Sequence, residues 1–148
     1  MGAAFNIRIA ETDDEIDRCF PVMAELRPKQ TRSGFVDQIR RQGEDNYRLV
    51  FLEDDDGIRA VGGFRISDNL AWGKYLYVDD LVTSERARSK GYGRALLGWL
   101  VDHARDAGCD ELHLDSGVQR FGAHRFYLRE GMDITSHHFT LKLREDRS

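Results

Sequence analysis

The sequence of 148 residues has few cysteines, no long apolar run and no excess of positive charge. Its two cysteines, Cys19 and Cys109, lie far apart without a CxxC spacing, which favours buried, reduced thiols over a disulfide framework or a zinc site. No apolar run approaches the roughly 20 residues needed to cross a bilayer, so we expect no membrane partner. The net charge of −4 argues against a nucleic-acid binder, because neutralising phosphates requires a basic face.

The length of the sequence and its N-terminal segment limit how the chain can be organised. A length of 148 residues allows one sizeable core, and no linker, repeat or low-complexity stretch divides it. We therefore expect a single domain over residues 1–148, with its core at about 5–143. Residues 1–8 lack a basic region followed by an apolar stretch, so we expect no secretory signal and a cytoplasmic location.

The hydrophobic pattern predicts a mixed sheet with helices. Alternation predicts a strand at 5–10, and Thr12 with Glu15 forms a capping box that predicts a helix from Asp13 to Leu26. The other expected elements are a helix at 33–43, strands at 47–53, 58–67 and 74–83, a helix through 95–104, a strand at 112–115, a helix at 120–130 and a last extended segment at 133–143. This order indicates an α+β fold, with helices over the faces of the sheet.

A glycine loop, Arg88-Ser89-Lys90-Gly91-Tyr92-Gly93, stands between an expected strand and an expected helix. The first N–H groups of a helix have no intrahelical partner and lie at the positive end of its dipole, so they bind phosphate well. Residues 85–94 carry four basic side chains against one glutamate, which indicates a single anionic ligand in an otherwise acidic protein. Two glycines in such a turn also occur for conformational reasons alone.

Two other phosphate-binding motifs are excluded by inspection. A P-loop ends in Gly-Lys-Ser/Thr, but here Lys90 precedes the glycine and neither Ser nor Thr follows Gly93. The dinucleotide-binding fingerprint requires a third glycine, where this chain has Leu96.

Two motifs together resemble a known family. Arg88-x-x-Gly91-x-Gly93 after the strand at 75–83 resembles the first signature of the GNAT superfamily of N-acetyltransferases, and Ala123-His-Arg-Phe-Tyr127-x-x-x-Gly131-Met resembles the second. The resemblance covers about residues 5–143. It implies the GNAT acyl-CoA N-acyltransferase fold, in which a central, mostly antiparallel sheet contains a splayed strand pair and carries flanking helices.

The resemblance implies acetyl-CoA as the cofactor, coenzyme A as product, and no metal. Backbone groups of residues 81–83 would pair with the pantetheine arm, and the amides of residues 89–94 would hold the pyrophosphate. Many family members have an asparagine where this chain has Arg120, and Ser116 is the candidate replacement for part of its contacts. The implied cofactor-binding residues are Leu81, Val82, Thr83, Arg88, Ser89, Lys90, Gly91, Tyr92, Gly93, Arg94, Ser116 and Phe126.

The resemblance also implies catalytic residues. Tyr127 occupies the position of the family's tyrosine, whose phenol donates a hydrogen bond or a proton to the leaving sulfur. The amine must lose a proton before it attacks, and Asp79 or Asp80 is the candidate base. Neighbours on a strand face opposite ways, so we expect one of them to face the acceptor. Similarity to the strand of spermidine/spermine acetyltransferases favours Asp79, with Asp80 second. Without the resemblance, Tyr127 also fits a buried core position. Asp79 and Asp80 also fit an ordinary solvated or salt-bridged pair with no catalytic role.

We therefore expect an enzyme that transfers the acetyl group of acetyl-CoA to a primary amine, with direct attack in a ternary complex. The acidic strand favours a small cationic acceptor. A protein or peptide amine is an alternative acceptor, and a non-catalytic acyl-CoA-binding regulatory module is an alternative function. A homodimer also stays open, because the family often forms dimers. The loops at 27–34 and 68–73, where the acceptor would bind, carry no pattern that identifies it.

Overall fold

The protein is described here by a computed structural model of residues 4–144; the first three residues of the segment that suggested a cytoplasmic location lie outside this range. The chain forms two compact units, Met1–Leu114 and Asp115–Ser148. The single domain expected over residues 1–148 stays a prediction. In the described part of the chain, no helix is both long and apolar enough to cross a membrane.

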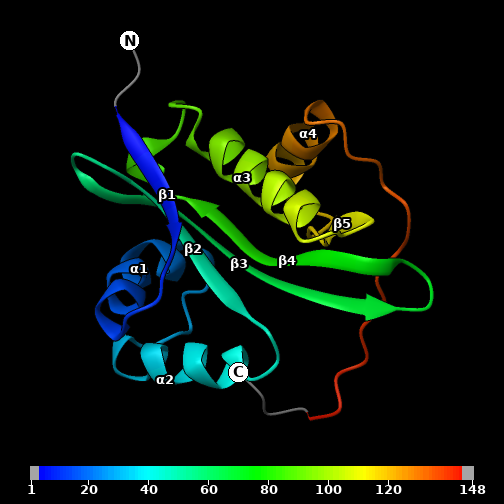
Figure 1. The fold of residues 1–148 in the computed structure, drawn as a ribbon, viewed down its shortest axis with the longest axis horizontal. Helices are drawn as coiled ribbons and strands as arrows, with labels where there is room; N and C mark the ends of the chain where they lie inside the picture. Colours follow the sequence, from blue (N-terminus) through cyan, green and yellow to red (C-terminus); the bar gives the residue numbers. More distant parts are fainter. Residues whose placement is uncertain (1–3, 145–148) are drawn as a thin grey trace. The chain divides into compact units, whose positions relative to one another are not determined.

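The first unit is built on a five-stranded sheet whose strands lie in sequence order (Figure 1). Neighbours from β1 to β4 pair antiparallel, and only β4 and β5 pair parallel. This confirms the expected mixed, mostly antiparallel sheet. The strand bounds are β1 Phe5–Ile9, β2 Arg48–Asp54, β3 Gly57–Asn69, β4 Gly73–Thr83 and β5 Glu111–Leu114.

Three helices cover the two faces of this sheet. Helices α1 (Asp13–Leu26) and α2 (Arg32–Gly43) lie on one side, and α3 (Tyr92–Asp106) lies on the other (Figure 1). Helix α1 begins where the sequence predicts, because the Thr12 side chain accepts from the Glu15 amide and the Glu15 side chain accepts from the Thr12 amide. Gly108 follows α3 with a φ of 80°, the left-handed conformation expected at the end of a helix.

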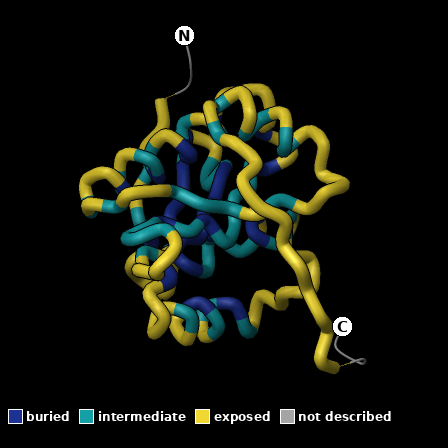
Figure 2. The backbone as a smooth tube through the Cα atoms, turned by 90° about the vertical axis from the view of Figure 1, so that its right-hand side faces the viewer, coloured by how far each residue is buried: buried dark blue, intermediate teal, exposed yellow. Residues whose placement is uncertain are grey.

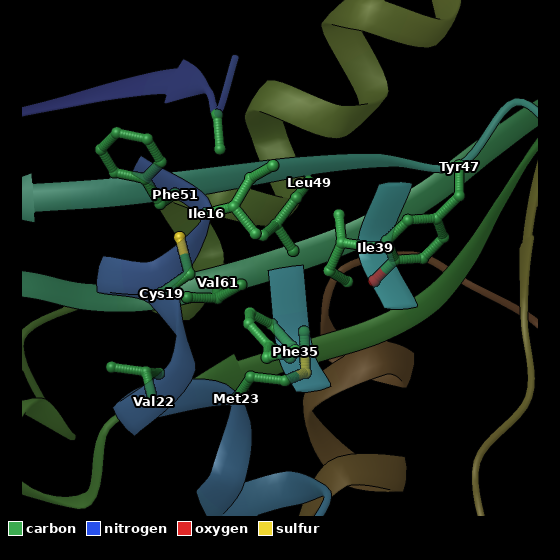
Figure 3. Close-up of a cluster of buried hydrophobic side chains, with 11 residues drawn as sticks. Ile16, Cys19, Val22, Met23, Phe35, Ile39, Tyr47, Leu49, Phe51 and Val61 are labelled. Atoms are coloured by element: carbon green, nitrogen blue, oxygen red, sulfur yellow. The ribbon is translucent and has the colours of Figure 1, made fainter. Parts of the chain in front are cut away.

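Each face of the sheet has its own hydrophobic cluster. The cluster under α1 and α2 joins Ile16 and Cys19 of α1 to Phe35 of α2 and to Phe51 and Val61 of the sheet. Figure 3 shows this cluster, with Tyr47 beside Ile39. The cluster under α3 joins Leu96 and Leu100 to strand residues such as Phe64, Leu76 and Val78. Both cysteines are free thiols, and burial raises the pKa of Cys19 to about 12.

The second unit contains α4 (Phe121–Arg129), followed by Gly131 with a φ of 90°. The expected last strand at 133–143 was wrong, because residues 133–144 form neither strand nor helix and are exposed throughout (Figure 2). Phe139, Leu141 and Leu143 alternate with polar residues, yet they are 91%, 83% and 89% exposed. An alternating pattern produces a strand only where a sheet edge pairs with it, and pairing is not encoded locally.

Candidate active site

Strand β4 contains a bulge at Asp79. Gly63 of β3 pairs with Asp80, whereas the next residue, Phe64, pairs with Val78. Asp79 is therefore the extra residue on β4. The bulge changes which residues of β4 face each side of the sheet. Val78 packs in the cluster under α3, while Val82 packs against the cluster under α1 and α2. The regular alternation that we expected between Asp79 and Asp80 does not hold here.

The second half of β4 has one free edge. Strand β5 pairs only with Tyr75–Val78, so among the described residues the segment Asp79–Thr83 has a strand neighbour on the β3 side alone. This is the splayed strand pair expected from the sequence. Leu81, Val82 and Thr83 are half-buried. Their unpaired edge is available for hydrogen bonding by an extended ligand.

Asp80 lies at the centre of a polar cluster on the side of the sheet that carries α1 and α2. Its Oδ2 accepts a 2.7 Å hydrogen bond from the Tyr47 hydroxyl, and its Oδ1 accepts a 2.8 Å bond from Arg27 Nε. Arg27 also donates from Nη2 to the carbonyl oxygen of Asp79, at 3.0 Å. The Asp80 side chain is 13% exposed and that of Arg27 is 50% exposed. The carboxylate is therefore largely enclosed, whereas the arginine side chain is half in contact with solvent.

Tyr47 is buried immediately before β2, and its pKa lies well above the ordinary value. Burial is the main cause, followed by the negative charge of Asp80. The phenol thus stays protonated and acts as a hydrogen-bond donor to Asp80. No pattern around Tyr47 in the sequence indicated this role, because its partner is 33 residues away.

Asp79 makes a different interaction. Both of its carboxylate oxygens accept from Arg65 of β3, from Nε and Nη2, each at 2.8 Å. The Asp79 side chain is 24% exposed and that of Arg65 is 44% exposed. Arg65 also lies 5.6 Å from the ring centroid of Tyr77. Asp79 and Asp80 are thus distinguished by the side chains that they bind, and not by pointing to opposite faces of the sheet.

A cavity of about 260 Å³ opens beside Asp80. Met23, Phe35 and Ile39 form its apolar part. Its polar lining consists of Arg27, Gln30, Gln38, Gln42, Tyr47 and Asp80. Of the two loops where we expected the acceptor to bind, the one at 27–34 contributes Arg27 and Gln30 to this cavity, and the one at 68–73, which includes Trp72, contributes no residue. Trp72 instead stacks on His113, with 3.5 Å between the ring centroids.

The glycine loop leads into α3 as expected. Ser89 has a φ of 74° and Gly91 a φ of 80°, and helix α3 begins at Tyr92 with no side chain capping its N-terminus. A Cβ on Gly91 would meet no atom within 4 Å, so space is open above the turn. Arg88, Ser89 and Lys90 are exposed. Free helix-start amides, open space and adjacent cations suit a pyrophosphate group.

The Tyr92 side chain is buried and points away from such a ligand. Its hydroxyl donates a 2.7 Å hydrogen bond to Asp54 Oδ2 at the end of β2. This bond raises the pKa of Tyr92. Only the backbone of Tyr92 is therefore suited to binding a phosphate. Its side chain anchors the start of α3 to the sheet.

A glutamate of α1 holds the segment between β4 and the glycine loop. Glu25 Oε2 accepts from the Ser84 hydroxyl at 3.1 Å, and Glu25 Oε1 accepts from the Glu85 amide at 2.8 Å. The short helical turn Glu85–Ala87 follows directly. Sequence reasoning missed Glu25, because its partners lie about sixty residues further along.

The second unit carries the remaining candidate residues. Tyr127 lies on α4, half-buried, and burial raises the pKa of its phenol while Arg120 lowers it by a smaller amount. Its ring packs edge-on against Phe126, with 5.3 Å between centroids. The Ser116 hydroxyl is buried and has no hydrogen-bond partner within residues 4–144. An unpaired buried hydroxyl is suited to a ligand contact.

The half-paired strand, the open glycine turn and the cavity at Asp80 define an acyltransferase of the kind that uses acyl-CoA. A family model described as the Acetyltransferase (GNAT) family matches residues 9–132, so the chain belongs to that family. It is an acetyl-CoA-dependent N-acetyltransferase, as the sequence motifs imply. The fold of this family binds acetyl-CoA or coenzyme A.

Relatives and solved structures agree with this assignment. The chain is 36% identical over 128 residues to the uncharacterized N-acetyltransferase YhdJ of Bacillus subtilis, covering 85% of this chain and 90% of that protein. It is 30% identical over 128 residues to glucosamine 6-phosphate N-acetyltransferase of Arabidopsis thaliana, covering 84% and 73%. The crystal structure of the Arabidopsis enzyme matches with a TM-score of 0.75 at 25% identity, over 95% of this chain and 99% of the other. An aminoglycoside N-acetyltransferase solved with CoA has the same fold, with a TM-score of 0.84 at 13% identity over 97% of both chains.

Proposed function

We propose that this enzyme acetylates the primary amine of a small molecule bound in the cavity beside Asp80, by direct attack in a ternary complex. The observation that carries this proposal is the position of the cavity, which is lined by Asp80, a residue of the segment Asp79–Thr83 that has no partner in β5. That position would put an acceptor next to the arm of a bound cofactor. A relative named aminoalkylphosphonate N-acetyltransferase, from Salmonella typhimurium, is 38% identical over 66 residues, covering 45% of this chain and 43% of that protein, and supports a small amine as acceptor.

When bound, acetyl-CoA supplies an acetyl group already activated as a thioester. The residues suited to hold it are the edge of β4 at Leu81–Thr83, the amides of the loop from Ser89 to Arg94, and the exposed cations Arg88 and Lys90. Ser116 and Phe126 are the candidate contacts from the second unit. The open turn at Gly91 accommodates a bulky diphosphate without a side-chain obstacle.

The acceptor amine arrives protonated near neutral pH, and a carboxylate at the cavity wall attracts it. Asp80 is the carboxylate that lines the cavity, and Tyr47 fixes its orientation. Sequence similarity favours Asp79, but Asp79 does not line the cavity and instead pairs with Arg65. We propose Asp80 as the group that binds the ammonium and takes its proton, directly or through water, with Asp79 as the alternative.

Tyr127 is the proposed donor to the leaving sulfur. A phenol whose pKa is raised keeps its proton and can give a hydrogen bond or a proton to a developing thiolate. No cysteine lies in either family motif, which supports direct transfer over an acyl-enzyme. The size of the cavity favours a small acceptor over a protein amine.

Isothermal titration of acetyl-CoA and of CoA against the wild type and the variants Gly91→Glu and Gly93→Glu tests the cofactor half of this proposal. We expect binding by the wild type and its loss in both variants, because a carboxylate at the start of α3 repels the pyrophosphate. Gly108→Glu is the matched control, since Gly108 has the same φ of 80° as Gly91, follows the far end of α3, and has no atom within 4 Å of the position that a Cβ would take. Binding that survives in both loop variants would move the cofactor site elsewhere.

The acceptor half is tested by following CoA release with a panel of primary amines that includes a short peptide. Turnover with small amines alone supports the proposal, whereas turnover with the peptide alone overturns it. The cytoplasmic location and a homodimer stay predictions.

A further inference from the structure

The cavity beside Asp80 has an unusual charge balance for a site that binds an amine. Its lining within the described chain contains one cation, Arg27, and one anion, Asp80, which are joined to each other. The other polar lining groups are the three glutamine amides and the Tyr47 hydroxyl, which are uncharged. A polycation would leave Arg27 repelled at the cavity wall, whereas a ligand with both charges satisfies both residues.

The pair is arranged so that a ligand can exchange with it. Asp80 is fixed by Tyr47 from the buried side, and its second oxygen, Oδ1, accepts from Arg27. Arg27 follows the last residue of α1 and its side chain is half-exposed, so it can swing outward while staying at the cavity mouth. An incoming ammonium then takes the place of the guanidinium at Oδ1, and the released guanidinium needs a new anion.

We propose that the acceptor is a small primary amine that also carries an acid group, with its ammonium on Asp80 and its carboxylate, phosphonate or phosphate on Arg27. This inference rests on the proposed function and names the class of its acceptor. A guanidinium binds either kind of acid group through paired N–H donors. The glutamine amides suit further polar atoms of the same molecule.

Size and spacing limit the acceptor further. A volume of about 260 Å³ is room for roughly nine water molecules, which corresponds to a compound about as large as an amino acid. Arg27 and Asp80 line the same cavity and are ion-paired before exchange, so one small acceptor can reach both of them. A compact amine therefore fits inside the cavity, whereas an aminoglycoside or a long polyamine would extend out of its open side.

The test compares matched amines that differ only in the acid group. The probes are amino acids, including β-alanine, each against its own carboxamide, together with aminoethylphosphonate against ethanolamine, and putrescine and spermidine as polycations. The readout is kcat/KM from CoA release. We expect the acid-bearing member of at least one pair to be preferred by about tenfold or more, the usual worth of a hydrogen bond to a charged group. The amino acid arm and the phosphonate arm identify which acid group the enzyme takes.

Arg27 variants show whether that preference comes from this residue. The preference is the ratio of kcat/KM for the acid-bearing amine to kcat/KM for its matched partner. We expect Arg27→Gln to bring this ratio close to one and Arg27→Lys to retain part of the preference. Arg32→Gln is the matched control, because Arg32 pairs with Asp17 on the surface and does not line the cavity. Melting curves confirm that each variant is folded.

The outcomes separate the inference from the proposed function. Equal or better turnover of carboxamides or polycations overturns the inference and leaves the proposed function intact. A preference for acids that is unchanged in Arg27→Gln also overturns it. Failure to acetylate any amine of the panel, with acetyl-CoA binding intact, overturns both.

Discussion

The hydroxyl of Tyr47 donates a 2.7 Å hydrogen bond to Asp80 Oδ2, and the same ring fills the space above Gly63, the residue that pairs with Asp80 across the sheet. A Cβ at position 63 would lie 1.8 Å from the Tyr47 oxygen and 2.4 Å from Cζ. Glycine is therefore required at this position by the ring, which in turn orients the carboxylate at the cavity wall.

We expect Gly63→Ala to displace the Tyr47 ring and to break its bond with Asp80. Because the buried ring must find a new position, the free energy of unfolding should fall by about 1–3 kcal/mol. The value of kcat/KM should fall with it. Urea denaturation and the rate of CoA release measure the two effects.

Gly98→Ala is the matched control for this change. Gly98 lies in the interior of α3, where an added Cβ would meet nothing within 4 Å, so alanine should raise stability by about 0.5–1 kcal/mol. A Gly63→Ala protein as stable and as active as the wild type would contradict the packing of Tyr47 against Gly63.

Single substitutions decide between the two carboxylates of β4. Asp80→Asn should lower kcat/KM by about a hundredfold or more, the scale of general acid–base catalysis. Asp79→Asn should cost less than about tenfold, because it removes a partly exposed ion pair with Arg65. Steady-state kinetics with circular dichroism as a folding check make the comparison. The reverse order of effects would assign the role to Asp79.

Tyr127→Phe should reduce kcat by about a hundredfold and leave the dissociation constant of acetyl-CoA unchanged, because only the donor to the leaving sulfur is removed. The pKa of Tyr127 is raised above 10.0, so its phenol is protonated throughout the neutral and mildly alkaline range. The kcat of the wild type should therefore show no loss from this group until the pH exceeds that value. An unchanged kcat in Tyr127→Phe would exclude it as the donor.

The link between Asp54 and Tyr92 predicts how stability depends on pH. Burial by itself would raise the pKa of Asp54, but hydrogen bonds from the Tyr92 hydroxyl and the Asp56 amide, with Arg59 and Lys90 nearby, lower it below 3.8 overall. A lowered pKa means that this carboxylate stabilises the fold fully above the unfolded value and loses its effect as the pH falls through the folded value.

We therefore expect Asp54→Asn to be less stable than the wild type at neutral pH, with the difference shrinking below about pH 4. Urea midpoints over this range measure the difference. Asp55→Asn, at an exposed neighbouring position of the same turn, is the control. A difference that stays constant down to acid pH would show that the charge of Asp54 contributes nothing.

Features that depend on a few neighbouring residues could be predicted from the sequence. The capping box of Thr12 and Glu15 located the start of α1, and Gly108 marked the end of α3. The two family motifs likewise predicted the fold and the class of enzyme, because each is a short local pattern. In these cases the residues that specify a structural feature lie within or next to that feature in the sequence.

Features that depend on distant partners could not be predicted. The bulge at Asp79 is defined by its register with β3, and Arg27 meets Asp80 across 53 residues of sequence. The tail at 133–143 alternates as a strand does, but nothing in its own residues specifies an edge to pair with. The sequence therefore carries a local pattern for the expected cofactor loop, whereas the residues that line the cavity beside Asp80 come together only in the fold.

The last turn of α1 has a consequence for how the two substrates influence each other. Glu25 holds Ser84 and Glu85, just before the glycine loop, and Arg27, two residues later, holds Asp80 at the cavity. If an acceptor displaces Arg27 and this turn shifts, the contacts of Glu25 would carry the shift to Ser84 and Glu85, which precede the glycine loop. Thermodynamic linkage requires that such an effect be reciprocal. If bound cofactor changes the affinity for the acceptor by some factor, bound acceptor changes the affinity for the cofactor by the same factor. Glu25 is thus placed to make the two binding events cooperative, although it is suited to contact neither ligand.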